Sequence, residues 1–182
     1  MIIHRILIIL TICYVQISLA QNSPLTVDKY KIHIRGVGKI LIGMSVADIE
    51  KVTGQQLKLE EDSLAEQNCA FYDFKNSTLG LSFMFTGPAK NNMKLARIYL
   101  YKSAIETISG IKIGDSLAKL KGTYKEKLEE TRGHYTNYLE YTYRPVDKSD
   151  KNYGIIFETD NRNITSISVG KYPELSLVEG CL

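Results

Sequence analysis

The sequence predicts an α+β fold made of two copies of one unit, in which a short strand and a helix precede an antiparallel β-meander. The segment ILIGMSVADI at residues 40–49 is similar to IKIGDSLAKL at residues 111–120. This similarity indicates a tandem duplication. Each segment is followed in the sequence by runs rich in β-branched and aromatic residues, and turn-forming residues separate these runs. This is the pattern of consecutive strands.

The start of each copy predicts a strand that leads into a helix. Ile40 and Ile42 alternate with other residues, as do the isoleucines at 111 and 113, which is the period of a half-buried strand. A glycine follows in both copies, and then Ser45 or Ser116. Serine is a favoured N-cap residue, so we expect each to begin a short helix. Asp48 suits a capping box with Ser45.

Strands are expected at residues 56–61, 68–74, 79–85 and 95–101 in the first copy, and at residues 127–132, 136–143, 153–159 and 164–169 in the second. The join near residues 102–109 is short and neither Gly- nor Pro-rich, so it is not a long flexible linker. The expected organisation is a signal peptide at 1–20, a first repeat at 30–103 and a second repeat at 104–182, with the repeats forming one composite globular unit.

The first residues have the pattern of a secretory signal. Arg5 precedes an apolar run at 6–12, and Ser18 and Ala20 form a small-x-small cleavage site. A retained membrane anchor is the alternative, but polar residues such as Gln16 interrupt the stretch before it reaches the length of about 20 residues that a span needs. We therefore expect a secreted or periplasmic protein with no stable membrane span after cleavage.

Two cysteines, Cys69 and Cys181, would remain after cleavage behind Ala20. In an oxidising compartment two such residues are expected to form a disulfide. A metal or nucleophile site is disfavoured, because no histidine lies near either cysteine in the sequence and no Cys-x-x-Cys spacing occurs.

The composition argues against several classes of ligand. The formal net charge is +3 at pH 7, with no run of five or more basic residues, so nucleic acid is not an expected partner. The acidic run 60–62, with Glu66 nearby, lacks the ligand order of a calcium loop. The glycines at 35–39 lack the spacing of a phosphate loop. We expect no metal and no cofactor.

A catalytic serine is also disfavoured. Ser45 lies in Gly-Met-Ser-Val-Ala, which approximates a nucleophile elbow without its last glycine. Ser116 has the same place in the second copy, and a helix cap explains both serines. A triad would need a positioned histidine, and we expect His33 and His134 to be surface residues. A hydrolase built on Ser45 and His134 is therefore the least favoured hypothesis, and the sequence predicts a non-enzyme.

Tyrosine is abundant, with twelve residues and no tryptophan in the chain. Tyr99 and Tyr101 alternate with apolar residues, so we expect them to face away from the core. Tyr141 and Tyr143 share a side of their strand with an apolar residue, which leaves their orientation ambiguous. All four are candidates for a protein interface, where rigid amphipathic rings are favoured. The alternative is that strand propensity alone explains these tyrosines.

The pattern I-x-I-G-M-S-x-x-D-I, followed by a helix and a meander, is similar to the repeat of the β-lactamase-inhibitory proteins. It also resembles the module of the SmpA/OmlA outer-membrane assembly lipoproteins. The resemblance covers residues 36–59 and 110–130 and implies a secreted, non-catalytic module that presents an aromatic-rich sheet to a globular protein. The inhibitory family has a disulfide within each repeat, whereas this chain has one cysteine in each, so we do not expect a β-lactamase as partner. The closing Glu-Gly-Cys resembles the end of uncharacterised bacterial secreted proteins.

These observations together predict a secreted or periplasmic protein-binding module, of the inhibitor or immunity type. The alternative is a cell-envelope assembly or scaffold protein. The expected partner is another protein, whose identity does not follow from the sequence.

Overall fold

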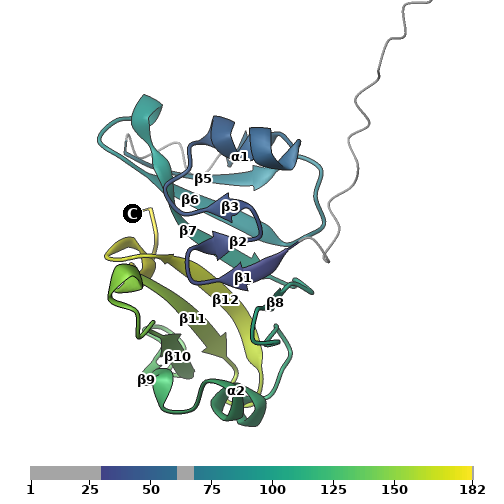
Figure 1. Cartoon of the computed structure of the whole chain (residues 1–182), viewed down its shortest axis with the longest axis vertical. Coiled ribbons are helices and arrows are strands. Elements are labelled where there is room, and N and C mark those ends of the chain that lie inside the picture. The colour runs from purple at the N-terminus through teal and green to yellow at the C-terminus, as the bar shows by residue number, and fades with distance from the viewer. Residues whose placement is uncertain (1–29, 61–67, 182) are drawn as a thin grey trace, which may run out of the picture.

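A computed structural model describes residues 30–60 and 68–181 of the chain (Figure 1). Its main element is an eight-stranded antiparallel sheet with strand order β4-β5-β6-β7-β12-β11-β10-β9. The strands are β4 (Leu57–Leu59), β5 (Cys69–Phe74), β6 (Leu81–Thr86), β7 (Lys94–Tyr101), β9 (Leu128–Arg132), β10 (Leu139–Tyr143), β11 (Tyr153–Thr159) and β12 (Ile164–Lys171). Each begins and ends within three residues of the bounds of an expected strand. Glu61, the last residue of the first expected strand, lies outside the described residues.

The large sheet consists of two four-stranded meanders that meet at its centre. β4 to β7 are neighbours in chain order, as are β9 to β12. The meanders join where β7 pairs antiparallel with β12, with Ile98 opposite Val169. These two central strands are also the longest, with eight residues each. The two halves of the chain therefore share one continuous sheet, and the predicted α+β class is confirmed.

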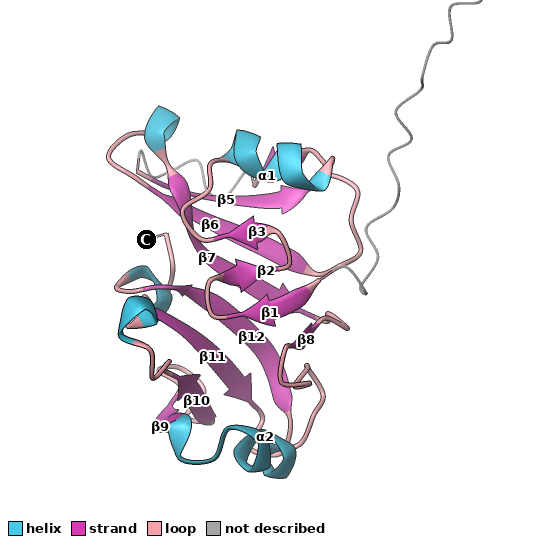
Figure 2. Ribbon diagram, in the orientation of Figure 1, coloured by secondary structure: helices cyan, strands magenta, loops and turns pink. Residues whose placement is uncertain are grey.

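A second, four-stranded sheet has the order β3-β2-β1-β8 and crosses one face of the large sheet (Figure 2). Its strands are β1 (Lys31–His33), β2 (Gly36–Val37), β3 (Ile40–Leu41) and β8 (Glu106–Thr107). The strand expected at residues 111–113 is absent, so that prediction is wrong. Residues 107–111 form a turn instead, in which Thr107 N–H donates to Ile111 O at 2.7 Å and Ile111 N–H donates to Thr107 Oγ1 at 3.1 Å.

The two helices begin at the predicted caps. The Ser45 hydroxyl accepts from the N–H of Asp48 at 3.2 Å, and the Asp48 carboxylate accepts from the N–H of Ser45 at 2.9 Å. This is a complete capping box. The Ser116 hydroxyl accepts from the N–H of Lys119 at 3.2 Å, but a lysine cannot return the bond. The helices are α1 (Val46–Thr53) and α2 (Leu117–Tyr124), and the short 3-10 helices are η3 (Lys90–Asn92), η4 (Lys125–Lys127), η5 (Lys148–Asp150) and η6 (Glu174–Ser176).

Both turns that precede the helices are tied to the large sheet in the same way. Gly43 N–H donates to Leu95 O at 2.8 Å, and Leu95 N–H donates to Met44 O at 2.8 Å. In the other half, Gly114 N–H donates to Ile164 O at 2.8 Å. The glycines have φ values of 95° and 89°, a conformation that favours glycine. Each helix therefore starts beside the first residues of a central strand.

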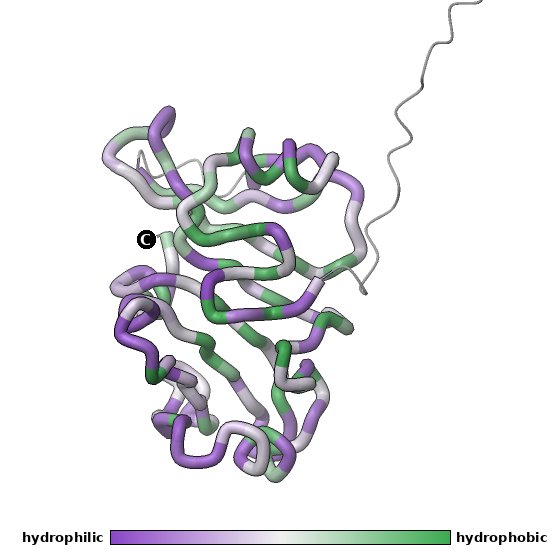
Figure 3. Tube along the Cα trace, viewed as in Figure 1, coloured by the Kyte–Doolittle hydropathy of each residue, from purple (hydrophilic) through white to green (hydrophobic). Residues whose placement is uncertain are grey.

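The two faces of the large sheet are covered differently. One face packs against α1, α2 and the small sheet in a continuous core that includes Phe83, Phe157 and Leu120. Figure 3 shows hydrophobic positions recurring between hydrophilic ones along the strands. The opposite face is partly covered by residues 172–181, which we call the C-terminal segment. Cys181 at its end forms the predicted disulfide with Cys69 on β5.

Candidate functional site

Tyr99 faces away from the main core, as predicted, but it is not exposed. Only 9% of its surface is accessible, whereas 48% of Tyr101 is. The Arg97 guanidinium lies 4.2 Å above the Tyr99 ring, and a Cβ on Gly180 would lie 3.2 Å from the Tyr99 hydroxyl. Because the C-terminal segment covers this part of the sheet, the prediction of an exposed Tyr99–Tyr101 pair is wrong for Tyr99 and right for Tyr101.

Tyr141 and Tyr143 belong to the core side of the sheet. Tyr141 is 1% exposed, and its hydroxyl donates to the Glu130 carboxylate at 2.8 Å. Tyr143 is half-buried against the core, and its ring centroid lies 4.9 Å from that of Tyr124 on α2. The structure resolves their ambiguous orientation, because α2 packs over both rings, while their part in an interface stays a prediction.

The residues of the disfavoured hydrolase have other roles. The Ser45 hydroxyl donates to the Asp48 carboxylate at 2.6 Å inside the capping box. Nε2 of His33 lies 3.1 Å from the carbonyl oxygen of Gly38 in the small sheet. Among the described residues, no group of three or more His, Cys, Asp or Glu side chains could hold a metal ion. No helix in that part of the chain is long and apolar enough to cross a membrane.

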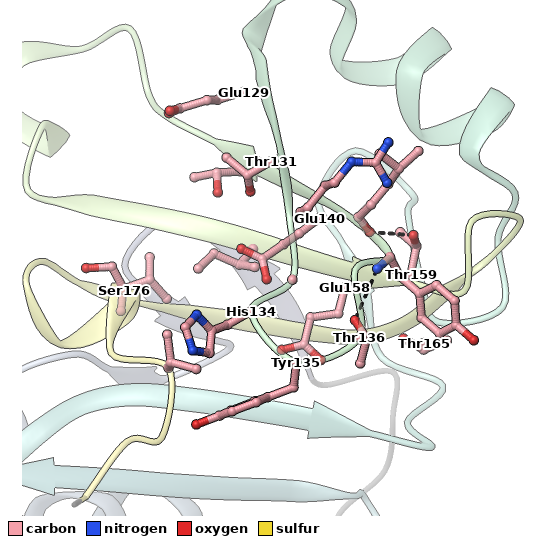
Figure 4. A pocket seen from close by; sticks show the side chains of 18 of the residues that line it. Glu129, Thr131, His134, Tyr135, Thr136, Glu140, Glu158, Thr159, Thr165 and Ser176 are labelled. Carbon is pink, nitrogen blue, oxygen red and sulfur yellow. Dashed lines mark hydrogen bonds between the residues drawn. The ribbon is translucent and has the colours of Figure 1, made fainter.

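A cavity of about 670 Å³ lies on the face away from the helices (Figure 4). Its floor is formed by β9 to β12, and residues such as Glu140 and Glu158 point into it because they alternate with core residues such as Tyr141 and Phe157. The loop at residues 133–138 and the C-terminal segment form its walls. The cavity joins parts of the chain that are distant in sequence.

Two carboxylates oppose each other in this cavity. Glu140 on β10 is directly opposite Glu158 on β11 in the strand register. Glu158 accepts a hydrogen bond from the Ser166 hydroxyl at 2.6 Å. Within the described structure, no hydrogen bond or ion pair reaches the carboxylate of Glu140. Burial raises the pKa of Glu140, and the negative charge of Glu158 raises it further, against a smaller opposite effect of Arg97.

The cations that line the cavity already have other partners. Arg144 donates to the Glu129 carboxylate at 2.9 Å. Arg132 donates to the carbonyl oxygen of Asn137 at 3.0 Å. Arg97 donates to the carbonyl oxygen of Leu177 at 2.9 Å and to Ser168 at 3.3 Å. The Glu140–Glu158 pair is thus not neutralised by a direct contact in the described part of the chain.

Exposed apolar side chains gather around the same cavity. Nine large hydrophobic residues in the described regions are exposed, and four of them line the cavity. These are Tyr135, Tyr138, Leu177 and Val178, with exposed fractions of 68%, 47%, 42% and 59%. Isolated exposed hydrophobic residues are common, whereas a group around one hollow is typical of a binding site. The sequence analysis missed this site, although Glu140 and Glu158 both lie on the polar side of predicted strands.

The carboxylate pair is expected to reduce stability. Glu140→Gln should raise the free energy of unfolding at pH 7 by a few tenths to about 1 kcal/mol, because like charges directly opposite on adjacent strands destabilise a sheet. The pKa of Glu140 is raised in the fold, so the folded state binds the proton more tightly than the unfolded state. The penalty therefore exists at neutral pH, shrinks as the pH falls through the raised pKa, and vanishes below the unfolded value of about 4.3.

Urea unfolding at pH 7 and at pH 4 measures this difference. The matched control is Glu126→Gln, at an exposed position on η4, which should change stability little at either pH. A loss of stability for Glu140→Gln at pH 7, or an equal gain at both pH values, would contradict the prediction.

Comparisons of the chain with protein-family models, with curated proteins and with solved structures gave no match. The fold class of the protein is therefore stated from its own structure. It is an α+β protein with a small sheet and two helices on one face of a large antiparallel sheet. The other face carries a cavity lined by both acidic and basic residues, with an apolar rim.

Proposed function

We propose that this chain is a secreted or periplasmic, non-catalytic protein-binding module, of the inhibitor or immunity type, which holds its partner at the cavity over β9 to β12. The main observation behind this proposal is that four exposed hydrophobic residues line that cavity, namely Tyr135, Tyr138, Leu177 and Val178. Exposed apolar groups rimmed by polar residues mark interaction surfaces, and a floor of charged residues gives such a surface specificity.

The disulfide and the sequence of the N-terminus support export. A bridge between Cys69 and Cys181 persists in an oxidising compartment and is rare in the cytosol. The signal pattern at residues 1–20 lies outside the described residues. Loss of that segment after Ala20 would leave a chain in which both cysteines are paired.

A tandem duplication would explain the features that the two halves share. The helix starts are anchored alike in both halves, at Gly43 and at Gly114. On the far face, the first half presents apolar residues such as Phe71 and Met84, which the C-terminal segment covers. The second half presents Glu140 and Glu158 in an open cavity. Features shared by both halves serve the fold, so we assign binding to the half that departs from the common pattern.

Affinity capture with matched baits tests this function. The bait Tyr135→Ala/Tyr138→Ala should retain its partner roughly tenfold less well than the wild type, because aromatic side chains dominate interface energies. The control Ile108→Ala/Val146→Ala removes two apolar side chains that are 74% and 77% exposed and do not line the cavity. That control bait should capture as the wild type does.

The identity of the captured protein separates the two functional hypotheses. A single soluble protein recovered in stoichiometric amount from exported material supports an inhibitor or immunity role. Recovery of outer-membrane components supports the assembly or scaffold role instead. Equal capture by the cavity variant and the wild type would show that the cavity is not the binding site.

A further inference from the structure

We infer that the cavity receives a lysine or arginine side chain from a protein partner, held between Glu140 and Glu158 while the apolar neighbours of that side chain contact the rim. This inference rests on the proposed function and specifies the chemistry of the partner. It assigns the two carboxylates as binding groups.

The first argument is the position of two carboxylates opposite each other on adjacent strands. Adjacent strands lie about 4.8 Å apart, and Glu140 and Glu158 are opposite each other on such strands. A guanidinium or ammonium between them would interact with both carboxylates. Arginine suits the position best, since its planar fork of donors matches carboxylate oxygens.

The second argument is that, within the described residues, no arginine of the cavity makes a hydrogen bond or ion pair with these two carboxylates. Arg144 is engaged by Glu129 and lies 4.6 Å above the Tyr172 ring. Arg97 is held by the C-terminal segment through Leu177. Turning Arg144 toward Glu140 would break its hydrogen bond to Glu129. A cation brought by the partner has no such cost.

The third argument concerns Arg97, which lines the same cavity and is only 5% exposed. Its Nε is buried and has no hydrogen-bond partner within the described residues. A buried donor without an acceptor is unfavourable. A peptide with a basic side chain also brings backbone carbonyl oxygens, which are acceptors of the kind that Arg97 lacks. An anionic ligand could satisfy Arg97 too, but it would meet the two carboxylates.

The rim favours a peptide over a free cation. Tyr135 and Tyr138 stand on the loop between β9 and β10, and Leu177 and Val178 stand on the C-terminal segment. These side chains lie on two walls of the cavity, so residues on both sides of a central basic residue would meet apolar surface. Apolar contact of this kind adds affinity that a small ion cannot gain.

A titration with blocked peptides tests the inference on the whole folded chain. The probe is acetyl-Leu-Arg-Leu-amide, and its matched control has citrulline, which has nearly the shape of arginine without the charge. Backbone amide NMR signals report where each peptide binds. We expect shifts at Glu140 and Glu158, and an affinity for the arginine peptide roughly tenfold or more above that for the citrulline peptide, as for loss of a charged hydrogen bond.

The variant Glu140→Gln/Glu158→Gln should keep its fold and lose this preference, while Glu126→Gln should keep it. Equal affinity for the two peptides, or shifts confined to residues outside the cavity, would overturn the inference. So would the absence of shifts at about 10 mM peptide, where even millimolar affinity is visible. If capture depends on Tyr135 and Tyr138 but arginine is not preferred, the inference fails and the proposed function stands.

Discussion

Replacing Cys69 and Cys181 together with alanine is expected to lower the free energy of unfolding by about 2–5 kcal/mol. The two cysteines are 112 residues apart in the sequence and lie 5.3 Å apart between their Cα atoms. A bridge over such a long loop restricts the unfolded chain strongly, and the chain-entropy model gives about 4 to 5 kcal/mol for it. Since domains of ordinary stability have only about 5–15 kcal/mol in total, this loss would be a large share of the stability of the fold.

The folded state should change as well, because the disulfide fixes the end of the C-terminal segment to β5. Leu177 O accepts from Arg97 at 2.9 Å, and Glu174 accepts from the Thr86 hydroxyl at 3.0 Å. Release of the end at Cys181 would uncover Tyr99 and Met84, which are 9% and 0% exposed. It would also loosen the wall of the cavity that contains Leu177. We therefore expect weaker partner binding in the same variant.

Urea unfolding with and without reductant provides the measurement. The wild type should lose stability when it is reduced, whereas the double alanine variant should not respond to reductant. A variant as stable as the oxidised wild type would contradict the prediction, and so would a wild type that is insensitive to full reduction.

The sequence was informative wherever structure depends on local pattern. The strands of both meanders follow from alternation of apolar residues, and β11 has the predicted bounds. Both helix starts follow from the serine caps, because a cap is made by residues three positions apart. The exception is residues 111–113, where alternation predicted a strand but Thr107 closes a turn. A short alternating segment forms a strand only where a neighbouring strand can pair with it.

The features that the sequence analysis missed depend on contacts between distant residues. Alternation correctly oriented Tyr99 away from the core, but its burial depends on Gly180 from the end of the chain. The cavity exists because the C-terminal segment returns to lie beside the loop at 133–138. Neither contact has a local signal. The predicted bridge between Cys69 and Cys181 was the one indication that the chain end returns to the sheet, and it did not specify which residues would be covered.

The second large effect is expected at Tyr141, which the structure assigns to the core. Its ring is 1% exposed, and the ammonium of Lys121 lies 5.0 Å from the ring centroid. Tyr141→Ala should lower the free energy of unfolding by about 3–5 kcal/mol, the usual cost of removing a buried aromatic ring. Tyr141→Phe keeps the ring and loses only the hydrogen bond to Glu130, so it should cost about 1 kcal/mol.

Tyr138 is the matched control, because it is on the same stretch of chain and 47% exposed. Tyr138→Ala should change stability by no more than about 0.5 kcal/mol, while it weakens capture of the partner. Tyr141→Ala should show the opposite pattern under conditions in which it stays folded, with a large loss of stability and little change in capture. Urea unfolding and capture with the same baits measure both effects. A Tyr141→Ala variant of normal stability that no longer captures the partner would restore Tyr141 to the interface and place the binding surface on the helix side of the sheet.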